Sequence, residues 1–134
     1  MLLDIDHFKR FNDLHGHDAG DLVLKSFVKA VRKTIRKIDS FGRWGGEEFM
    51  VLVYDSRQVD LRVIGEKILK SVVDCEIDYQ GIKLHVTASM GIATWQGGSF
   101  DETVSLADKA MYQAKESGRN RFVVYQDERK KSRK

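Results

Sequence analysis

Three carboxylates in this sequence lie where they could bind a metal ion. Asp4 ends an apolar stretch that reads as a short buried strand, and Glu47 and Glu48 begin another strand directly after Gly45-Gly46. A hairpin can place the residues next to its turn beside the end of a neighbouring strand. We therefore expect Asp4 and Glu47 to converge at one edge of a sheet. Such carboxylates favour Mg²⁺ or Mn²⁺, hard cations that often share their coordination with phosphate.

Phosphoryl transfer is the chemistry that such a cation supports. The cation lowers the pKa of an attacking hydroxyl and neutralises charge on the phosphate. Each acid alone is more typical of a solvated strand end, but an acid-flanked apolar strand together with a glycine hairpin and two acids is more specific. Because Gly45 and Gly46 have no side chains, a triphosphate could lie close over their backbone.

The hydrophobic pattern predicts the strands and helices that would position these acids. Apolar residues run or alternate in the expected strands and recur at helical spacing in the expected helices. Strands are predicted over residues 1–5, 40–44, 47–54, 83–95 and 121–125, the fourth of them returning from a hairpin turn near Gln80-Gly81. Helices are predicted over residues 7–14, from the 16–21 turn as far as Ile38, over 59–73, and over 100–117.

Glycines mark two ends in this pattern. Gly45-Gly46 is predicted to be a two-residue hairpin turn with the positive φ angles that glycine tolerates. Gly118 is predicted to end the last helix as its C′ residue. Because hairpins join several strands, we expect an α+β fold whose central sheet is mixed, mostly antiparallel and flanked by helices, rather than a parallel doubly wound sheet.

The composition fits one cytoplasmic domain. The chain has 134 residues, 42% of them hydrophobic, and a single cysteine, which excludes an internal disulfide. No apolar run is long enough to span a bilayer. The net charge of +3 comes from the end of the chain, because removing the five cations of residues 129–134 leaves 18 Lys+Arg against 20 Asp+Glu. We expect a domain over residues 1–127 and a disordered basic tail over 128–134, which without interleaved aromatic residues predicts no nucleic-acid contact.

An ordered set of motifs resembles the GGDEF domain family over essentially the whole chain except the tail. The signature run appears in its glutamate form, preceded by an arginine and an aromatic residue. The matching runs are Asp4-Ile5-Asp6-His7-Phe8-Lys9-Arg10-Phe11-Asn12-Asp13, Gly16-His17-Asp18-Ala19-Gly20-Asp21, Arg43-Trp44-Gly45-Gly46-Glu47-Glu48-Phe49, Ala88-Ser89-Met90-Gly91-Ile92-Ala93, Ala107-Asp108-Lys109-Ala110-Met111-Tyr112-Gln113-Ala114-Lys115 and Gly118-Arg119-Asn120.

The resemblance implies a fold and an activity. The fold would be like the palm of nucleotide cyclases and polymerases, with a ferredoxin-like core. The activity would be that of a diguanylate cyclase, which converts two GTP into cyclic di-GMP, a bacterial second messenger, and two pyrophosphates. Each GTP is attacked by the other, so two domains would face each other in a homodimer.

The resemblance also implies roles for individual residues. Those expected to hold Mg²⁺ or Mn²⁺ are Asp4, the backbone carbonyl of Ile5, Glu47 and Glu48, with Glu47 also the general base. Those expected to bind GTP are Asn12 and Asp21 at the guanine, Gly45 and Gly46 beneath the triphosphate, and Lys9, Lys115 and Arg119 at the phosphates. Basic residues in the last turn of a helix also interact favourably with its dipole, which is the alternative for the last two.

Arg36 and Asp39 form an Arg-x-x-Asp pattern at the same offset from the glycine hairpin as the family's product-inhibition site. Arg36 would bind guanine or phosphate of cyclic di-GMP through its planar donor fork, and Asp39 would accept from the guanine edge. The alternative is a basic helix end followed by a turn aspartate.

The sequence differs from the family's pattern at its beginning. Family members carry a helix and a Leu-Thr-Gly-Leu…Asn-Arg turn before the first strand, whereas this sequence starts at that strand. We therefore expect an upstream regulatory domain in a longer, possibly membrane-anchored protein. The alternative to a cyclase is an inactive domain that acts as a receptor for cyclic di-GMP or GTP.

Overall fold

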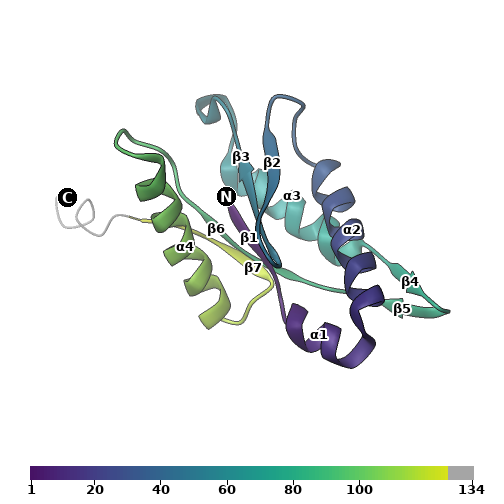
Figure 1. Ribbon diagram of the computed structural model, residues 1–134. Helices are drawn as coiled ribbons and strands as arrows, with labels where there is room; N and C mark the ends of the chain where they lie inside the picture. The colour runs from purple at the N-terminus through teal and green to yellow at the C-terminus, as the bar shows by residue number, and fades with distance from the viewer. Residues whose placement is uncertain (127–134) are drawn as a thin grey trace.

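The central sheet has five strands, and β1 lies in its middle (Figure 1). In this computed structural model, which describes residues 1–126, the order is β2 (Ser40–Gly45), β3 (Glu48–Leu52), β1 (Leu2–Ile5), β6 (Ala88–Ile92) and β7 (Arg121–Val124). Neighbouring strands are antiparallel except β6 and β7, which are parallel. The predicted mixed, mostly antiparallel sheet is confirmed.

Helices lie on both faces of this sheet. α2 (His17–Arg32) and α3 (Leu61–Asp74) pack on one face, and α4 (Phe100–Glu116) packs on the other (Figure 1). α1 (Phe8–His15) joins β1 to α2, and a short 3₁₀ turn, η1 (Ser56–Gln58), precedes α3. β4 (Ile77–Tyr79) and β5 (Ile82–Leu84) form a separate two-stranded sheet. The α+β class is confirmed.

Alternation along β1 places its side chains in two apolar cores. Leu3 and Ile5 belong to the larger core, with residues of α2 and α3. Leu2 belongs to the smaller core, with Met111 of α4. Because successive side chains of a strand point to opposite faces, Asp4 shares the α4 face with Leu2. Burial of the apolar residues thus determines which face carries the acid.

β6 and α4 approach each other closely at Gly91. A Cβ atom built on Gly91 would lie 1.9 Å from the carbonyl oxygen of Ala107 and 2.4 Å from the amide nitrogen of Met111. The backbone of the helix therefore lies almost directly on the strand, which fixes the position of α4 over the sheet.

α4 begins at the predicted residue, Phe100, and ends at the predicted glycine signal. The Ser99 hydroxyl caps it by accepting a hydrogen bond of 3.1 Å from the amide of Glu102. At the other end Gly118 has a φ of 122°, and the amide of Arg119 donates to the carbonyl of Ala114 at 3.0 Å. Gly118 is thus confirmed as the residue that ends the helix.

The helix predicted as far as Ile38 is shorter than expected. α2 ends at Arg32, and both the amide and the hydroxyl of Thr34 donate to the carbonyl of Val31, at 3.0 Å and 2.7 Å. These local bonds take the acceptor that the next helical turn needs. Ile38 is 60% exposed and does not continue the buried stripe.

The single strand predicted over residues 83–95 is also wrong. Leu84 pairs with Ile77 in the two-stranded sheet, whereas Ala88 pairs with Ile5 in the central sheet. The chain therefore leaves one sheet and enters another, and the segment between β5 and β6 belongs to neither. A hydrophobic pattern cannot reveal this change because both parts are apolar.

The glycine turn differs from the prediction in its centre and in its backbone. β2 includes Gly45, which pairs with Glu48, so the two turn residues are Gly46 and Glu47. None of these residues has a positive φ. The pairing shifts between Arg43 and Gly45, and a bulge of this kind supplies the extra twist that a positive-φ turn would otherwise provide.

The turn at Gln80-Gly81 does have the left-handed backbone of a two-residue hairpin, with φ values of 51° and 83°. Within residues 1–126, no helix is long and apolar enough to cross a membrane. The tail predicted over residues 128–134 lies outside the described residues.

Candidate functional site

The acids expected to bind metal lie together at the end of β1. Asp4 is directly opposite Glu48 in the β1–β3 pairing, so both carboxylates stand on the α4 face. The amide of Ile5 donates to the carbonyl oxygen of Glu47 at 3.3 Å, which holds the β2–β3 turn against the end of β1. Strand pairing therefore brings the backbone of residues 4–5 beside that of residues 47–48.

The electrostatics show acids that repel one another. Burial raises the pKa of Asp4, a hydrogen bond from Lys115 opposes this shift, and the charges of Glu47 and Asp6 add to it. Burial also raises the pKa of Glu48, and the charge of Asp4 raises it further. Gathered carboxylates of this kind are stabilised by a cation.

Lys115 supplies positive charge at this place. Its ammonium group forms an ion pair with the carboxylate of Asp4, and its side chain is 27% exposed. Among the described residues, no three His, Cys, Asp or Glu side chains are already arranged around one metal position. The oxygen donors of Asp4, Glu47, Glu48 and the Ile5 carbonyl suit Mg²⁺ or Mn²⁺, provided that the ion displaces Lys115 from Asp4.

The glycines beside these acids leave open space. A Cβ on Gly46 would meet nothing within 4 Å, and one on Gly45 would meet only the carboxylate of Glu48, at 3.8 Å. Neither glycine is thus required by the packing of this chain or by a positive φ. Glycine here is explained if a ligand lies over the turn.

The residues expected at the guanine come from the two helices that follow β1. Asn12 lies on α1 and Asp21 in the second turn of α2. The side-chain oxygen of Asn12 is buried and has no hydrogen-bond partner within residues 1–126. A Cβ on Gly20 would lie 1.7 Å from this oxygen, so the amide packs on the α2 backbone next to Asp21. A buried acceptor without a partner suits a ligand N–H group.

The cations expected at the phosphates lie at different places around the acids. Lys115 is in the last turn of α4, and Arg119 follows α4 in a left-handed conformation with a φ of 60°. Lys9 is exposed on α1, after the end of β1. Of the three, only Lys115 forms an ion pair with the acids in the part of the chain that the structure describes.

Two carboxylates of this region have no role in the sequence analysis. Asp6 is 8% exposed and accepts hydrogen bonds from β6 and from the turn after α4. Asp108 on α4 contributes to the raised pKa of Glu48 through its charge. The two-residue spacing of Asp4 and Asp6 could have indicated Asp6, because residues i and i+2 of an extended segment share a face.

Arg36 and Asp39 bind each other. The guanidinium of Arg36 donates to both oxygens of Asp39, at 2.9 Å and 3.1 Å, and also to the carbonyl of Tyr54. The amides of Arg36 and Tyr54 donate to Asp39 as well, at 2.9 Å and 3.3 Å. The Asp39 side chain is 1% exposed. Its hydrogen bonds connect the loop after α2 to the end of the β2–β3 hairpin.

These hydrogen bonds make the stability depend on Asp39 and on pH. Burial tends to raise the pKa of Asp39, but the hydrogen bonds from Arg36 and Tyr54 outweigh it and lower the pKa below the usual 3.8. A carboxylate with a lowered pKa stabilises the fold fully at pH values above its unfolded-state pKa. This contribution is lost as the pH falls through the lower, folded-state pKa. Asp39→Asn should therefore lower the free energy of unfolding at pH 7 by about 1–3 kcal/mol.

Urea unfolding of parent and Asp39→Asn from pH 7 down to pH 3 measures this effect. The difference between the two should shrink as the pH falls below 3.8. Asp13→Asn, at an exposed position of α1, is the matched control and should change little. A difference between Asp39→Asn and parent that is the same at every pH would contradict the prediction.

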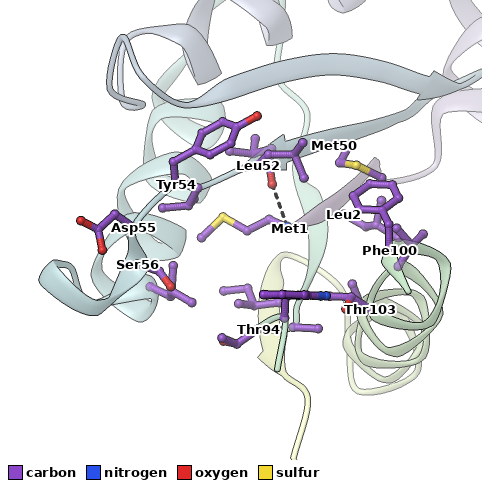
Figure 2. Close-up of a pocket in the computed structure, with 18 of the residues that line it drawn as sticks. Met1, Leu2, Met50, Leu52, Tyr54, Asp55, Ser56, Thr94, Phe100 and Thr103 are labelled. Atoms are coloured by element: carbon purple, nitrogen blue, oxygen red, sulfur yellow. Dashed lines mark hydrogen bonds between the residues drawn. The ribbon is translucent and has the colours of Figure 1, made fainter. Parts of the chain in front are cut away.

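An apolar groove lies apart from the acids (Figure 2). It has a volume of about 850 Å³ and is lined mainly by apolar residues of β1, β3, β6 and α4. Figure 2 shows Met1 in its middle, with Leu52 and Tyr54 on one side and Phe100 on the other. The Met1 amine donates to the carbonyl of Val51 at 2.8 Å, and burial lowers its pKa to about 6.

Comparisons with known proteins agree with this geometry. The family model described as "Diguanylate cyclase, GGDEF domain" matches residues 1–121. Diguanylate cyclase A of Treponema denticola is 39% identical over 126 residues, which are 92% of this chain and 34% of that protein. Diguanylate cyclase DgcP of Pseudomonas aeruginosa is 42% identical over 124 residues, again 92% of this chain but 18% of the relative. The chain thus spans about a third or less of these relatives.

Solved structures show the same similarity. Diguanylate cyclase SiaD of Pseudomonas aeruginosa, solved with its activator SiaC, has a TM-score of 0.87 at 40% identity, over 92% of this chain and 48% of that one. The GGDEF domain of DgcB from Caulobacter crescentus, solved with c-di-GMP, has a TM-score of 0.81 at 30% identity, over 94% of this chain and 76% of that one. The palm-like α+β fold expected from the sequence is confirmed.

Proposed function

This chain belongs to the GGDEF family of diguanylate cyclases, and from that premise we propose that it condenses two GTP into cyclic di-GMP and two pyrophosphates. The observation that carries the proposal is the pairing of Asp4 with Glu48 beside Glu47, at the end of β1 and next to an open glycine turn. A domain that had lost this chemistry would not need to keep three repelling acids together.

Binding of GTP uses groups on both sides of the acids. Asp4, Glu47, Glu48 and the Ile5 carbonyl would hold Mg²⁺ or Mn²⁺, which supplies charge neutralisation at the triphosphate. Lys115 exchanges Asp4 for phosphate oxygens, and Arg119 and Lys9 add positive charge. The backbone at Gly45 and Gly46 allows close approach. Asn12 and Asp21 hydrogen-bond the guanine, which selects GTP over ATP.

The bond-forming step needs a base and a second GTP. The carboxylate of Glu47 accepts the proton of the 3′-hydroxyl, and that oxygen attacks the α-phosphorus of the GTP bound by a second copy of the domain. The bond from the α-phosphorus to the bridging oxygen breaks, and pyrophosphate leaves. The same exchange in the opposite direction closes the ring. The two domains therefore face each other across a two-fold axis.

The experiment that tests this function is incubation of the chain with Mg²⁺ and GTP, with the products separated by chromatography. Cyclic di-GMP and pyrophosphate are expected, at rates that rise faster than linearly with protein concentration below the dimerisation constant. A chain that binds GTP but forms no cyclic di-GMP at any concentration would contradict the proposal, and strictly linear rates from a verified monomer would contradict the dimer.

Product inhibition at Arg36 and Asp39 is part of the proposal. Two nitrogens of the Arg36 fork are bound to Asp39 and Tyr54, and its Nη1 group has no partner among the side chains that the structure describes, so it can still donate to a ligand. If the chain formed no product, saturable cyclic di-GMP binding that is lost in Arg36→Ala would support the receptor alternative.

We place the synthesis of cyclic di-GMP in the cytoplasm, where GTP is available.

A substitution at Gly20 tests the guanine site. In Gly20→Ala the new Cβ would overlap the side-chain oxygen of Asn12, which must move. Loss of one hydrogen bond of about 1.4 kcal/mol corresponds to roughly tenfold weaker GTP binding. Alanine also favours the helix, so the stability should change by no more than about 1 kcal/mol.

Calorimetric titration with GTP and with inorganic triphosphate measures this effect. Affinity for GTP should fall in Gly20→Ala and equally in Asn12→Ala, whereas affinity for triphosphate should be unchanged in both. If Gly20→Ala bound GTP as tightly as the parent, Asn12 would not contact the guanine.

A further inference from the structure

Asp6 is a buried carboxylate whose oxygens are all occupied by protein donors. Its Oδ1 accepts from the hydroxyl of Ser89 at 2.6 Å, and its Oδ2 accepts from the hydroxyl of Thr87 at 2.6 Å and from the amide of Asn120 at 3.0 Å. Its own amide donates to the carbonyl of Thr87 at 2.9 Å. Asp6 therefore differs from Asp4, whose carboxylate is bound by the ammonium group of Lys115 alone among the described side chains.

The three donors are of two kinds. Thr87 and Ser89 lie just before and within β6, and their hydroxyl hydrogens can rotate to other acceptors. Asn120 lies in the turn between α4 and β7, and its backbone N–H has a fixed direction. Of the three hydrogen bonds, the one from the Asn120 amide therefore depends most on the position of the Asp6 carboxylate.

This turn has an unusual backbone. Gly118, Arg119 and Asn120 have consecutive positive φ values of 122°, 60° and 47°. Left-handed conformations cost roughly 1 kcal/mol or more for residues other than glycine, so they persist where the surroundings hold them. The bond from Asn120 to Asp6 spans 114 residues of sequence and connects this turn to the end of β1.

We propose that Asp6 is a positioning residue that holds the α4–β7 turn in place, so that Arg119 is directed to the triphosphate. This inference rests on the proposed function, in which Arg119 contacts phosphate. Asp6 acts through the Asn120 amide and does not touch the substrate. Two neighbouring acids of β1 thus have separate tasks: Asp4 faces the metal and Lys115, and Asp6 fixes the loop that carries the second phosphate cation.

The test compares binding of two nucleotides to folded variants. The probes are GMP and a GTP analogue with a methylene group between its α- and β-phosphorus atoms, both with Mg²⁺. Asp6→Ala should weaken binding of the analogue by roughly tenfold to a hundredfold and leave GMP binding unchanged. Ser89→Ala is the matched control, because it removes a donor to the same carboxylate but keeps the Asn120 bond. It should bind both probes as the parent does.

Two further variants separate positioning from support of the fold. Asp6→Asn keeps an oxygen that can accept from Asn120, since the hydroxyls can rotate to accept from its amide, and it should restore much of the affinity. In an Arg119→Ala background, Asp6→Ala should have no further effect on the analogue. Equal weakening of GMP and analogue, equal effects of Ser89→Ala and Asp6→Ala, or additive effects with Arg119→Ala would each overturn the proposal.

Hydrogen exchange gives a readout that does not depend on nucleotide binding. In the parent the amide of Asn120 should exchange slowly. In Asp6→Asn it should stay protected. Rapid exchange of this amide in a parent whose β6 amides are protected would overturn the proposal, even if Asp6→Ala did not fold. If instead the parent did not bind the analogue while Asn120 was protected, the proposed function would fail, not the connection between Asp6 and the turn.

Discussion

Glu47→Gln is expected to lower the rate of cyclic di-GMP formation by roughly 10²–10⁴-fold, the range for loss of a general base. The amide has the same shape as the carboxylate but cannot take the proton of the 3′-hydroxyl, and it is a weaker ligand for a hard cation. The fold should be unaffected, because the backbone of Glu47 makes the contact with Ile5 and the side chain is half-buried in a turn.

Steady-state product formation and thermal unfolding of the same preparations measure the two parts of this prediction. Glu66→Gln is the matched control, because it makes the same substitution at an exposed position of α3. It should leave both activity and melting temperature unchanged. If Glu47→Gln retained activity within a few-fold of the parent, another group would have to be the base.

Gly91→Ala should destabilise the domain by at least about 3 kcal/mol, which is enough to unfold many domains of this size. Its Cβ would lie 1.9 Å from the Ala107 carbonyl oxygen and 2.4 Å from the Met111 amide nitrogen, both of them backbone atoms of α4. A flexible side chain could move aside, but here the helix itself must leave the strand. Because α4 carries Lys115, GTP binding should be lost with the packing.

Urea denaturation monitored by circular dichroism would give the free energies of unfolding. Gly42→Ala is the control, because Gly42 is also a strand glycine and a Cβ there would meet nothing within 4 Å. This control should be as stable as the parent or slightly more stable. A Gly91→Ala protein with the stability of the parent would mean that α4 does not lie on β6 as described.

The sequence by itself determined the class of fold and some local features of the candidate site. Burial of Leu3 and Ile5 on one face of β1 leaves Asp4 for the other, so alternation alone fixes the side of the sheet on which the first acid stands. The C′ glycine after α4 is also a local signal. It acts through its neighbours in sequence, and its outcome could therefore be predicted.

Only the tertiary structure decided which groups the acids meet. Lys115 pairs with Asp4 across 111 residues, and the Asn120 amide binds Asp6 across 114, and no local spacing encodes either contact. The change of sheet after Leu84 was likewise decided by strand pairing and not by hydrophobic period. The physical reason is that hydrophobicity specifies which face is buried, whereas the partner of a polar group depends on which backbone the packed fold brings beside it.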